Sequence, residues 1–207
     1  MEKEVMPLGP IEANCIILWN DPAKAWIVDP GADAEAVVAF CEKRGLVPAL
    51  VALTHGHFDH IGAVPDLVAK WPGLAVHLAP ADEVLAFSPL NAWPPHYTRT
   101  ERPSTLVADL VEGSVLECGG LSAKVLSTPG HTPGSVCLHF EGEGLMLTGD
   151  TLFAGSCGRT DFPGGDKHQL DASLSRLAAL DPELTVVPGH GMPTTIAHEV
   201  ATNPFMQ

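Results

Sequence analysis

The chain has 207 residues, 45% of them hydrophobic, and it contains 20 glycines and 19 prolines. That length can bury a substantial core without disulfides, so we expect a single domain over residues 1–207 with short elements and many loops. The formal net charge of −14 argues against nucleic acid and anionic membranes as partners, because such binding needs clustered lysine and arginine. No apolar run reaches the ~20 residues of a membrane span. The N-terminus lacks a signal-peptide pattern and the five cysteines are scattered, which favours a cytoplasmic protein.

Short apolar runs that end in Gly, Pro, Asp or His recur along the chain, as expected of strands that stop in turns. They cover residues 14–20, 25–31, 49–55, 74–79, 121–130, 135–142, 145–150 and 185–191. Helical patterns lie between several of them. Because strands and helices mix in this way, we predict an α/β (α+β) sandwich in which helices shield the sheets.

Three helices are predicted from caps and apolar spacing. Asp33 is expected to cap a helix that Gly45 ends, and Asp166 is expected to open another. Between these two, apolar residues recur at helical spacing from Ile61 to Trp71. The segment Ser88–Ser104 has no regular pattern and is predicted to be a long surface loop, either functional or mobile.

A cluster of potential metal ligands follows the run at residues 49–55. His55 and His57 alternate in an extended segment and can face one cation, while Asp59 and His60 at the following turn can face another. Imidazole and carboxylate without thiolate suit zinc, iron or manganese in sites with open positions. Three further strand ends supply the ligands that two cations would still need: His131, Asp150 and His190. The remaining histidines lack this context and are expected to be structural or exposed: His77, His96, His139, His168 and His198.

The motif from His55 to His60 resembles the HxHxDH motif of the metallo-β-lactamase fold superfamily, and the later ligands follow in that family's order. The resemblance covers nearly the whole chain and implies a four-layer αββα sandwich. It also implies two metal sites and a shared aspartate: His55, His57 and His131 on the first metal, Asp59, His60 and His190 on the second, and Asp150 bridging.

The segment Gly149–Asp166, "GDTLFAGSCGRTDFPGGD", resembles the glyoxalase II branch, whose members hydrolyse glutathione thioesters. The resemblance implies a metal-dependent hydrolase that cleaves a thioester such as S-lactoylglutathione through a hydroxide bridging two divalent metal ions. Zinc is the first choice, with iron or manganese as alternatives, and Asp59 would orient the hydroxide or handle its proton. Arg159 occupies the place of a glutathione-binding residue, but pairing with Asp161 to pin the loop is an equally good reading of it.

The chain ends soon after His190, without the helical C-terminal region of full-length glyoxalase II. It is therefore similar to the short, single-domain glyoxalase II-like proteins of bacteria, and glutathione recognition would need other residues. Tyr97 and Arg99, in the segment Ser88–Ser104, are candidates for contact with a small-molecule substrate, as is Arg102. The sequence leaves the acyl group and the oligomeric state open.

Other activities on the same fold remain as alternatives. A persulfide dioxygenase with a single iron shares the fold and a similar "GCGRTDF" loop. A hydrolase of another ester or lactone would use the same ligands. A secreted β-lactamase is disfavoured by the missing signal-peptide pattern.

Overall fold

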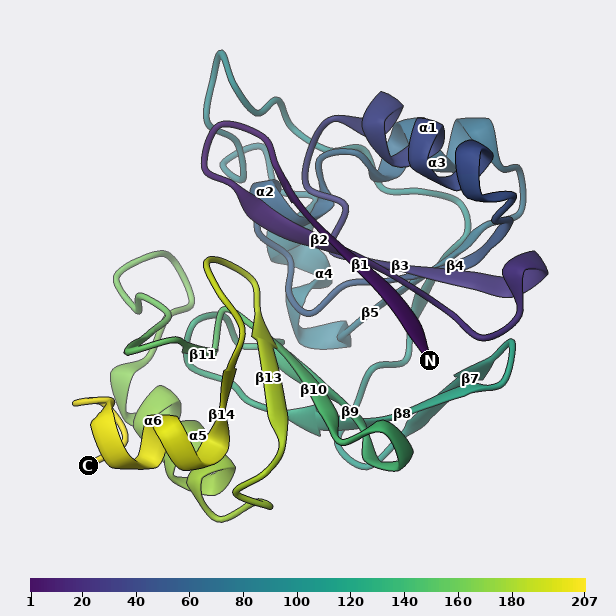
Figure 1. Ribbon diagram of the computed structural model, residues 1–207. Helices are drawn as coiled ribbons and strands as arrows, with labels where there is room; N and C mark the ends of the chain where they lie inside the picture. Colours follow the sequence, from purple (N-terminus) through teal and green to yellow (C-terminus); the bar gives the residue numbers. More distant parts are fainter.

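Two six-stranded sheets occupy the middle of the computed structural model, which describes residues 1–207 (Figure 1). In the first sheet the strands follow chain order, antiparallel from β1 to β3 and parallel from β3 to β6. Its central strands are continuous apolar runs, as expected of strands buried on both faces. The strands are β1 (Glu2–Leu8), β2 (Ala13–Trp19), β3 (Ala25–Val28), β4 (Pro48–Ala52), β5 (Ala75–Leu78) and β6 (Leu106–Ala108).

The second sheet has the strand order β14-β13-β10-β9-β8-β7, and only its β10–β13 pair is parallel. Gly119 and Gly120 both have a positive φ and form the tight turn between β7 and β8. The strands of this sheet are β7 (Val115–Cys118), β8 (Leu121–Ser127), β9 (Val136–Phe140), β10 (Leu145–Gly149), β13 (Thr185–Pro188) and β14 (Thr194–Thr195). A separate hairpin pairs β11 (Leu152–Phe153) with β12 (Ser156–Cys157).

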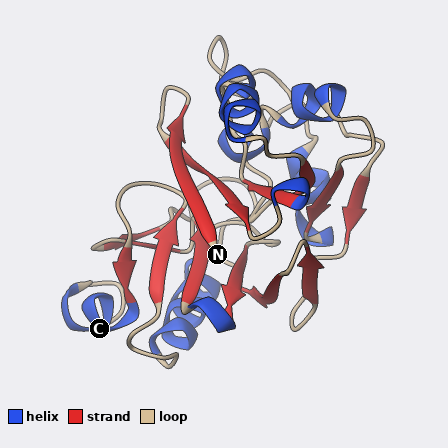
Figure 2. Ribbon diagram, turned by 45° about the vertical axis from the view of Figure 1, so that its right-hand side comes forward, coloured by secondary structure: helices blue, strands red, loops and turns tan.

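Helices cover the outer face of each sheet, so the layers follow one another as helix, sheet, sheet and helix (Figures 1 and 2). On the first sheet lie α1 (Ala34–Arg44) and α3 (Val64–Lys70), and on the second lie α5 (Lys167–Ala178) and α6 (Ile196–Thr202). The predicted four-layer αββα sandwich is confirmed. The short helices are η1 (Pro22–Lys24), α2 (Phe58–Ile61), η2 (Pro80–Asp82), α4 (Glu83–Ala86) and η3 (Glu141–Glu143). None of the helices has both the length and the apolar composition of a membrane span.

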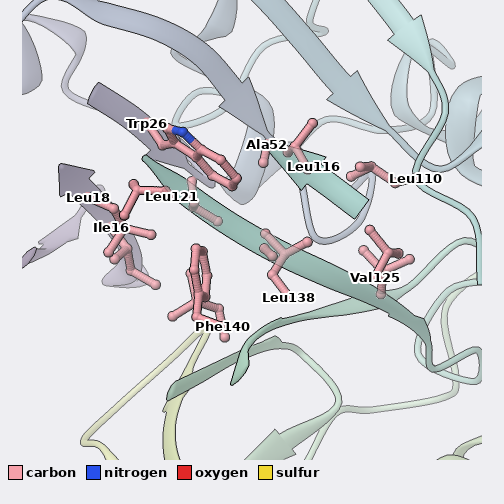
Figure 3. Close-up of a cluster of buried hydrophobic side chains, with 14 of the residues drawn as sticks. Ile16, Leu18, Trp26, Ala52, Leu110, Leu116, Leu121, Val125, Leu138 and Phe140 are labelled. Carbon is pink, nitrogen blue, oxygen red and sulfur yellow. The ribbon is translucent and has the colours of Figure 1, made fainter. Parts of the chain in front are cut away.

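The central core lies between the two sheets (Figure 3). Trp26 from the first sheet meets Phe140 from the second, with ring centroids 5.6 Å apart. Both are fully buried, and the Trp26 indole N–H donates a hydrogen bond to the carbonyl of Cys118 at 3.1 Å. Burying one large apolar side chain contributes about 1.5–3 kcal/mol, so this layer joins the sheets firmly and fixes the relative position of their ends.

The predicted elements are found with two corrections. All eight apolar runs contain a strand, and Asp166 caps α5 by accepting from the N–H groups of His168 and Gln169. Asp33 precedes α1 but does not cap it. Its φ is 49° and its carboxylate instead accepts from the N–H of Gly9 at 2.8 Å.

The pattern that begins at Ile61 forms two helices rather than one. The chain turns at Gly62, between α2 and α3, and α3 begins at Val64 with Pro65 in its first turn. Proline lacks a backbone N–H and therefore suits the first turn of a helix. The segment Ser88–Ser104 is irregular apart from a bridge between Trp93 and Tyr97, as predicted.

Candidate metal centre

Four loops at one edge of the sandwich bring the seven predicted ligands together. The segment from His55 to His60 follows β4 of the first sheet. The other three ligands come from the second sheet, where His131 lies between β8 and β9, Asp150 follows β10 and His190 follows β13. The central core holds the sheets together and so keeps the strand ends that carry these loops at one edge.

The first group consists of His55, His57 and His131, whose ligand atoms all lie within 4.8 Å of one another. His57 Nδ1 and His131 Nε2 are 2.8 Å apart. His55 Nε2 is buried and has no hydrogen-bond partner. A polar atom buried in this way is costly unless something binds it, and a cation would do so.

The second group consists of Asp59, His60 and His190, whose ligand atoms also lie within 4.8 Å of one another. Asp59 Oδ2 is 3.3 Å from His190 Nε2 and 3.6 Å from His60 Nε2. The two imidazole Nε2 atoms of His60 and His190 are 3.4 Å apart. His190 is the most exposed ligand, so this group lies nearer the surface.

Asp150 lies between the two groups. Its Oδ2 is 3.5 Å from His131 Nε2 in the first group, and its Oδ1 is 3.4 Å from His60 Nε2 in the second. Asp150 Oδ1 is buried without a hydrogen-bond partner. One carboxylate therefore reaches both groups, which is the arrangement expected of a bridging ligand.

Backbone carbonyls orient two of the imidazoles. His131 Nδ1 lies 2.7 Å from the carbonyl oxygen of Arg159, and His190 Nδ1 lies 3.2 Å from that of Ile11. A carbonyl can only accept, so each Nδ1 carries the proton and each Nε2 is free to bind a cation.

A buried aspartate orients the imidazole of His60. Asp29 Oδ2 is 3.1 Å from His60 Nδ1, and the same carboxylate accepts from the N–H of Thr54 at 2.7 Å and from its hydroxyl at 2.6 Å. Asp29 follows β3 with a φ of 51°, an unusual conformation for a residue other than glycine. This conformation places its carboxylate within contact distance of Thr54 and His60.

The charge states of the cluster suit cation binding. Burial, reinforced by His131, lowers the pKa of His57 to about 4, which keeps the imidazole neutral and able to act as a ligand. Burial and the neighbouring histidines likewise lower the pKa of His55. For Asp150 burial opposes ionisation, but His60 and the other histidines hold its pKa well below the usual range. At His60 and His190 burial opposes the charged form, but Asp59 and Asp150 raise the pKa of both imidazoles. A bound cation would take the place of these protons. Imidazoles and carboxylates together form a donor set that fits divalent cations, so the cluster is consistent with a metal site.

Arg159 was predicted to bind substrate. Its backbone lies beside the first group, because its carbonyl oxygen contacts His131 Nδ1. Its side chain is exposed and pairs with Asp161, with Nε and Nη2 at 2.6 and 2.7 Å from the two carboxylate oxygens. The guanidinium also stacks on Phe162 at 4.0 Å from the ring centroid, and that ring is 5.6 Å from the ring of His57. The alternative reading, an ion pair that pins this loop, is therefore present in the structure.

The other predicted substrate residues differ in their distance from the ligands. Tyr97 is 4% exposed and packs 5.0 Å from the ring of Phe58, which lies inside the ligand motif. Its buried hydroxyl has no hydrogen-bond partner. Arg99 donates from Nε to the carbonyl of Phe87 at 3.1 Å and makes no hydrogen bond or ion pair with a predicted ligand.

A family model matches most of the chain. The model described as the metallo-beta-lactamase superfamily matches residues 8–190. The chain belongs to this superfamily. It is 34% identical over 212 residues to the hydroxyacylglutathione hydrolase GloC of Haemophilus influenzae, an alignment that covers 100% of this chain and 98% of that protein.

Solved structures of the metallo-beta-lactamase superfamily superpose on nearly the whole chain. The BLEG-1 B3 metallo-beta-lactamase is 36% identical with a TM-score of 0.90, and the match covers 99% of both chains. TTHA1623 in a di-iron-bound form is 38% identical with a TM-score of 0.85, covering 98% of this chain and 99% of that one. ETHE1 from Myxococcus xanthus is 26% identical with a TM-score of 0.77, covering 99% and 84% respectively.

The residues that orient the proposed ligands were not predicted from the sequence. Asp29 could have been found, because it comes directly after the strand in the apolar run 25–31, as Asp150 does after its own strand. The carbonyls of Ile11 and Arg159 could not, because every residue has a carbonyl and only the fold decides which one meets an imidazole.

Proposed function

We propose that this member of the superfamily is a metal-dependent hydrolase that cleaves thioesters such as S-lactoylglutathione. The observation that carries the proposal is the position of Asp150 between the two ligand groups, since a shared carboxylate is typical of hydrolytic sites with two metals. The similarity to GloC along the whole chain supports the thioester as substrate. A single domain over residues 1–207, a small-molecule substrate and a cytoplasmic location complete the proposal.

The proposal assigns two divalent cations to the cluster. One is held by His55, His57 and His131, the other by Asp59, His60 and His190, with Asp150 shared. Zinc is the first candidate, and the di-iron-bound form of TTHA1623 supports both the number of ions and iron as an alternative to zinc. Bound divalent cations polarise a carbonyl group and lower the pKa of a coordinated water.

Asp59 is the proposed catalytic residue. It is 6% exposed, and its Oδ2 faces His60 and His190. A carboxylate here can accept a hydrogen bond from the attacking water, direct it toward the acyl carbon and take up its proton. A thiolate is a good leaving group, because the pKa of a thiol is only about 8.5, so the site needs no strong acid to protonate it as it leaves.

The residues proposed to contact substrate surround this cluster. Arg159 would bind a carboxylate of the substrate in place of Asp161. The exchange is feasible because both partners of the Arg159–Asp161 ion pair are exposed. Tyr97 and Arg99 would contact the substrate from the segment Ser88–Ser104, with the buried Tyr97 lying deeper in the site than the exposed Arg99. The ring of Tyr97 is already packed on Phe58 of the ligand motif.

The experiment is hydrolysis of S-lactoylglutathione by the purified, metal-loaded protein. Asp150→Ala should abolish turnover because it removes the shared ligand. Asp171→Ala is the matched control, since Asp171 is an exposed carboxylate paired only with Lys167 on α5, and this variant should retain activity. Normal turnover by Asp150→Ala would refute the two-metal proposal.

Hydrolysis of β-lactams is a second candidate, favoured by the 36% identity and full-length match to BLEG-1. Nitrocefin hydrolysis measured beside thioester hydrolysis separates the two. Faster turnover of nitrocefin than of every thioester would move the assignment to a β-lactamase. The dioxygenase alternative is tested by oxygen uptake with glutathione persulfide in the same preparation.

A further inference from the structure

Asp82 is a fully buried carboxylate outside the metal cluster. It lies at the end of η2, just before α4, and is 0% exposed. No lysine, arginine or histidine forms an ion pair with it, and burial raises its pKa. A buried carboxylate with no cationic partner is costly, so its hydrogen bonds must compensate.

Every donor that Asp82 receives from another part of the chain belongs to a ligand loop. Its Oδ2 accepts from the N–H of Gly56 at 2.8 Å and from the hydroxyl of Thr132 at 2.7 Å, and its Oδ1 accepts from the N–H of Gly134 at 2.6 Å. Gly56 lies between His55 and His57, and Thr132 follows His131. One carboxylate therefore joins a loop of the first sheet to a loop of the second.

The hydrogen bonds of Asp82 connect the two loops that together form the first ligand group. His55 and His57 come from the loop after β4, whereas His131 comes from the loop between β8 and β9. A Cβ on Gly134 would lie 2.7 Å from Asp82 atoms, so the backbone of the second loop is pressed directly against this carboxylate. A shift of Asp82 would change the distance between His57 and His131.

Asn91 holds the same loop from the other side. Its Nδ2 donates to the carbonyl of Gly56 at 2.8 Å and to that of Ala86 at 2.9 Å, while its Oδ1 accepts from the N–H of Phe58 at 3.1 Å. Like Asp82 it is buried, at 4% exposed. Residues 82–91 thus fix the backbone on both sides of His57.

We propose that Asp82 is a positioning residue, which sets the spacing of the His55–His57 and His131 loops and so determines how tightly the first ligand group binds its cation. Asp82 touches neither a ligand side chain nor a substrate. The inference rests on the proposed metal centre. If the unmodified protein binds no cation, the metal centre fails, whereas a failure confined to the Asp82 variants leaves the metal centre intact.

The test compares Asp82→Asn with Glu199→Gln. Glu199 is also 0% exposed and also receives three donors, from Gly155 N–H, the Thr194 hydroxyl and Asn203 Nδ2, but none of these belongs to the His55–His57 or His131 loop. An amide offers one acceptor oxygen where the carboxylate offers two. Both variants should therefore lower the melting temperature of the metal-free protein.

Only Asp82→Asn should weaken zinc binding, measured by competition with a chromophoric chelator. Loss of a residue that orients metal ligands typically costs about 10–100-fold in metal affinity, and we expect Glu199→Gln to bind zinc as the unmodified protein does. Unchanged zinc affinity in Asp82→Asn, or an equal loss in both variants, would overturn the inference. If Asp82→Asn does not fold, the same zinc-affinity measurement is made on Thr132→Val. It removes one donor to Asp82, and unchanged affinity in that variant would overturn the inference in the same way.

Discussion

Replacing Asp29 with asparagine tests how His60 is kept in its ligating form. The carboxylate makes three contacts, with the N–H and hydroxyl of Thr54 at 2.7 and 2.6 Å and with His60 Nδ1 at 3.1 Å. Asparagine has one acceptor oxygen, so if it accepts from the Thr54 N–H its amide N–H₂ group faces His60. His60 Nδ1 must then accept, which moves the imidazole proton to Nε2 and blocks the nitrogen that faces the cluster.

The expected magnitude follows from one compromised polar contact, between Asp29 and His60, in a buried place. The cost is about 1–3 kcal/mol of unfolding free energy, and the affinity for cation should fall by about 10–100-fold. The backbone itself should tolerate the change, because asparagine accepts the left-handed conformation that Asp29 adopts at a φ of 51°. Urea unfolding of the metal-free protein measures the first effect, and zinc titration against a competing chelator measures the second.

Asp33→Asn is the matched control for this experiment. Asp33 has a similar φ of 49° and accepts one backbone N–H, from Gly9, but it is exposed and does not contact a ligand. It should leave zinc affinity unchanged. Full zinc affinity in Asp29→Asn, or an equal loss in Asp33→Asn, would refute the role given to Asp29.

Three further predictions concern the core, the thiols and the metal. Phe140→Ala, in the layer between the sheets, should destabilise the protein by about 3–5 kcal/mol in urea unfolding, against less than about 0.5 kcal/mol for Val115→Ala at a position 55% exposed. Of the five cysteines only Cys118 and Cys157 are partly exposed, so these two alone should react with Ellman's reagent in the native state, Cys157 more slowly because burial raises the pKa of its thiol. Burial raises the pKa of Cys137 to about 11, and a fast third thiol would contradict this packing. Removing the metal with a chelator should lower the melting temperature, because a ligand at a concentration 100 times its Kd stabilises a protein by about 2.7 kcal/mol; an unchanged melting temperature would contradict a cation bound at this cluster.

The central strands could be predicted from the sequence because each is an apolar run closed by a turn residue. The edge strands β1 and β6 could not, since their residues are largely exposed or half-buried and their extended form depends on pairing with a neighbour. The prediction that Asp33 caps α1 was wrong for a similar reason. Asp33 has the composition of a cap, but the tertiary fold directs its carboxylate to Gly9.

The clustering of the seven proposed ligands could be predicted because each stands in a turn after a strand, and a shared edge of the sheets then brings them together. Their relative distances could not, because these depend on Asp82 and Asn91, which join loops far apart in the chain. Neither Asp82 nor Asn91 lies in a sequence motif that would indicate such a role. Arg159 shows a third case, in which the sequence left two roles open and the structure contains the ion pair with Asp161.

Metal content measured on the purified protein together with hydrolysis of S-lactoylglutathione tests whether the cluster is a hydrolytic site with two metals. We expect about two divalent ions per chain and thioester cleavage that is lost on chelation and restored by adding the metal back. One iron per chain, oxygen uptake with glutathione persulfide and no cleavage of any thioester would contradict it.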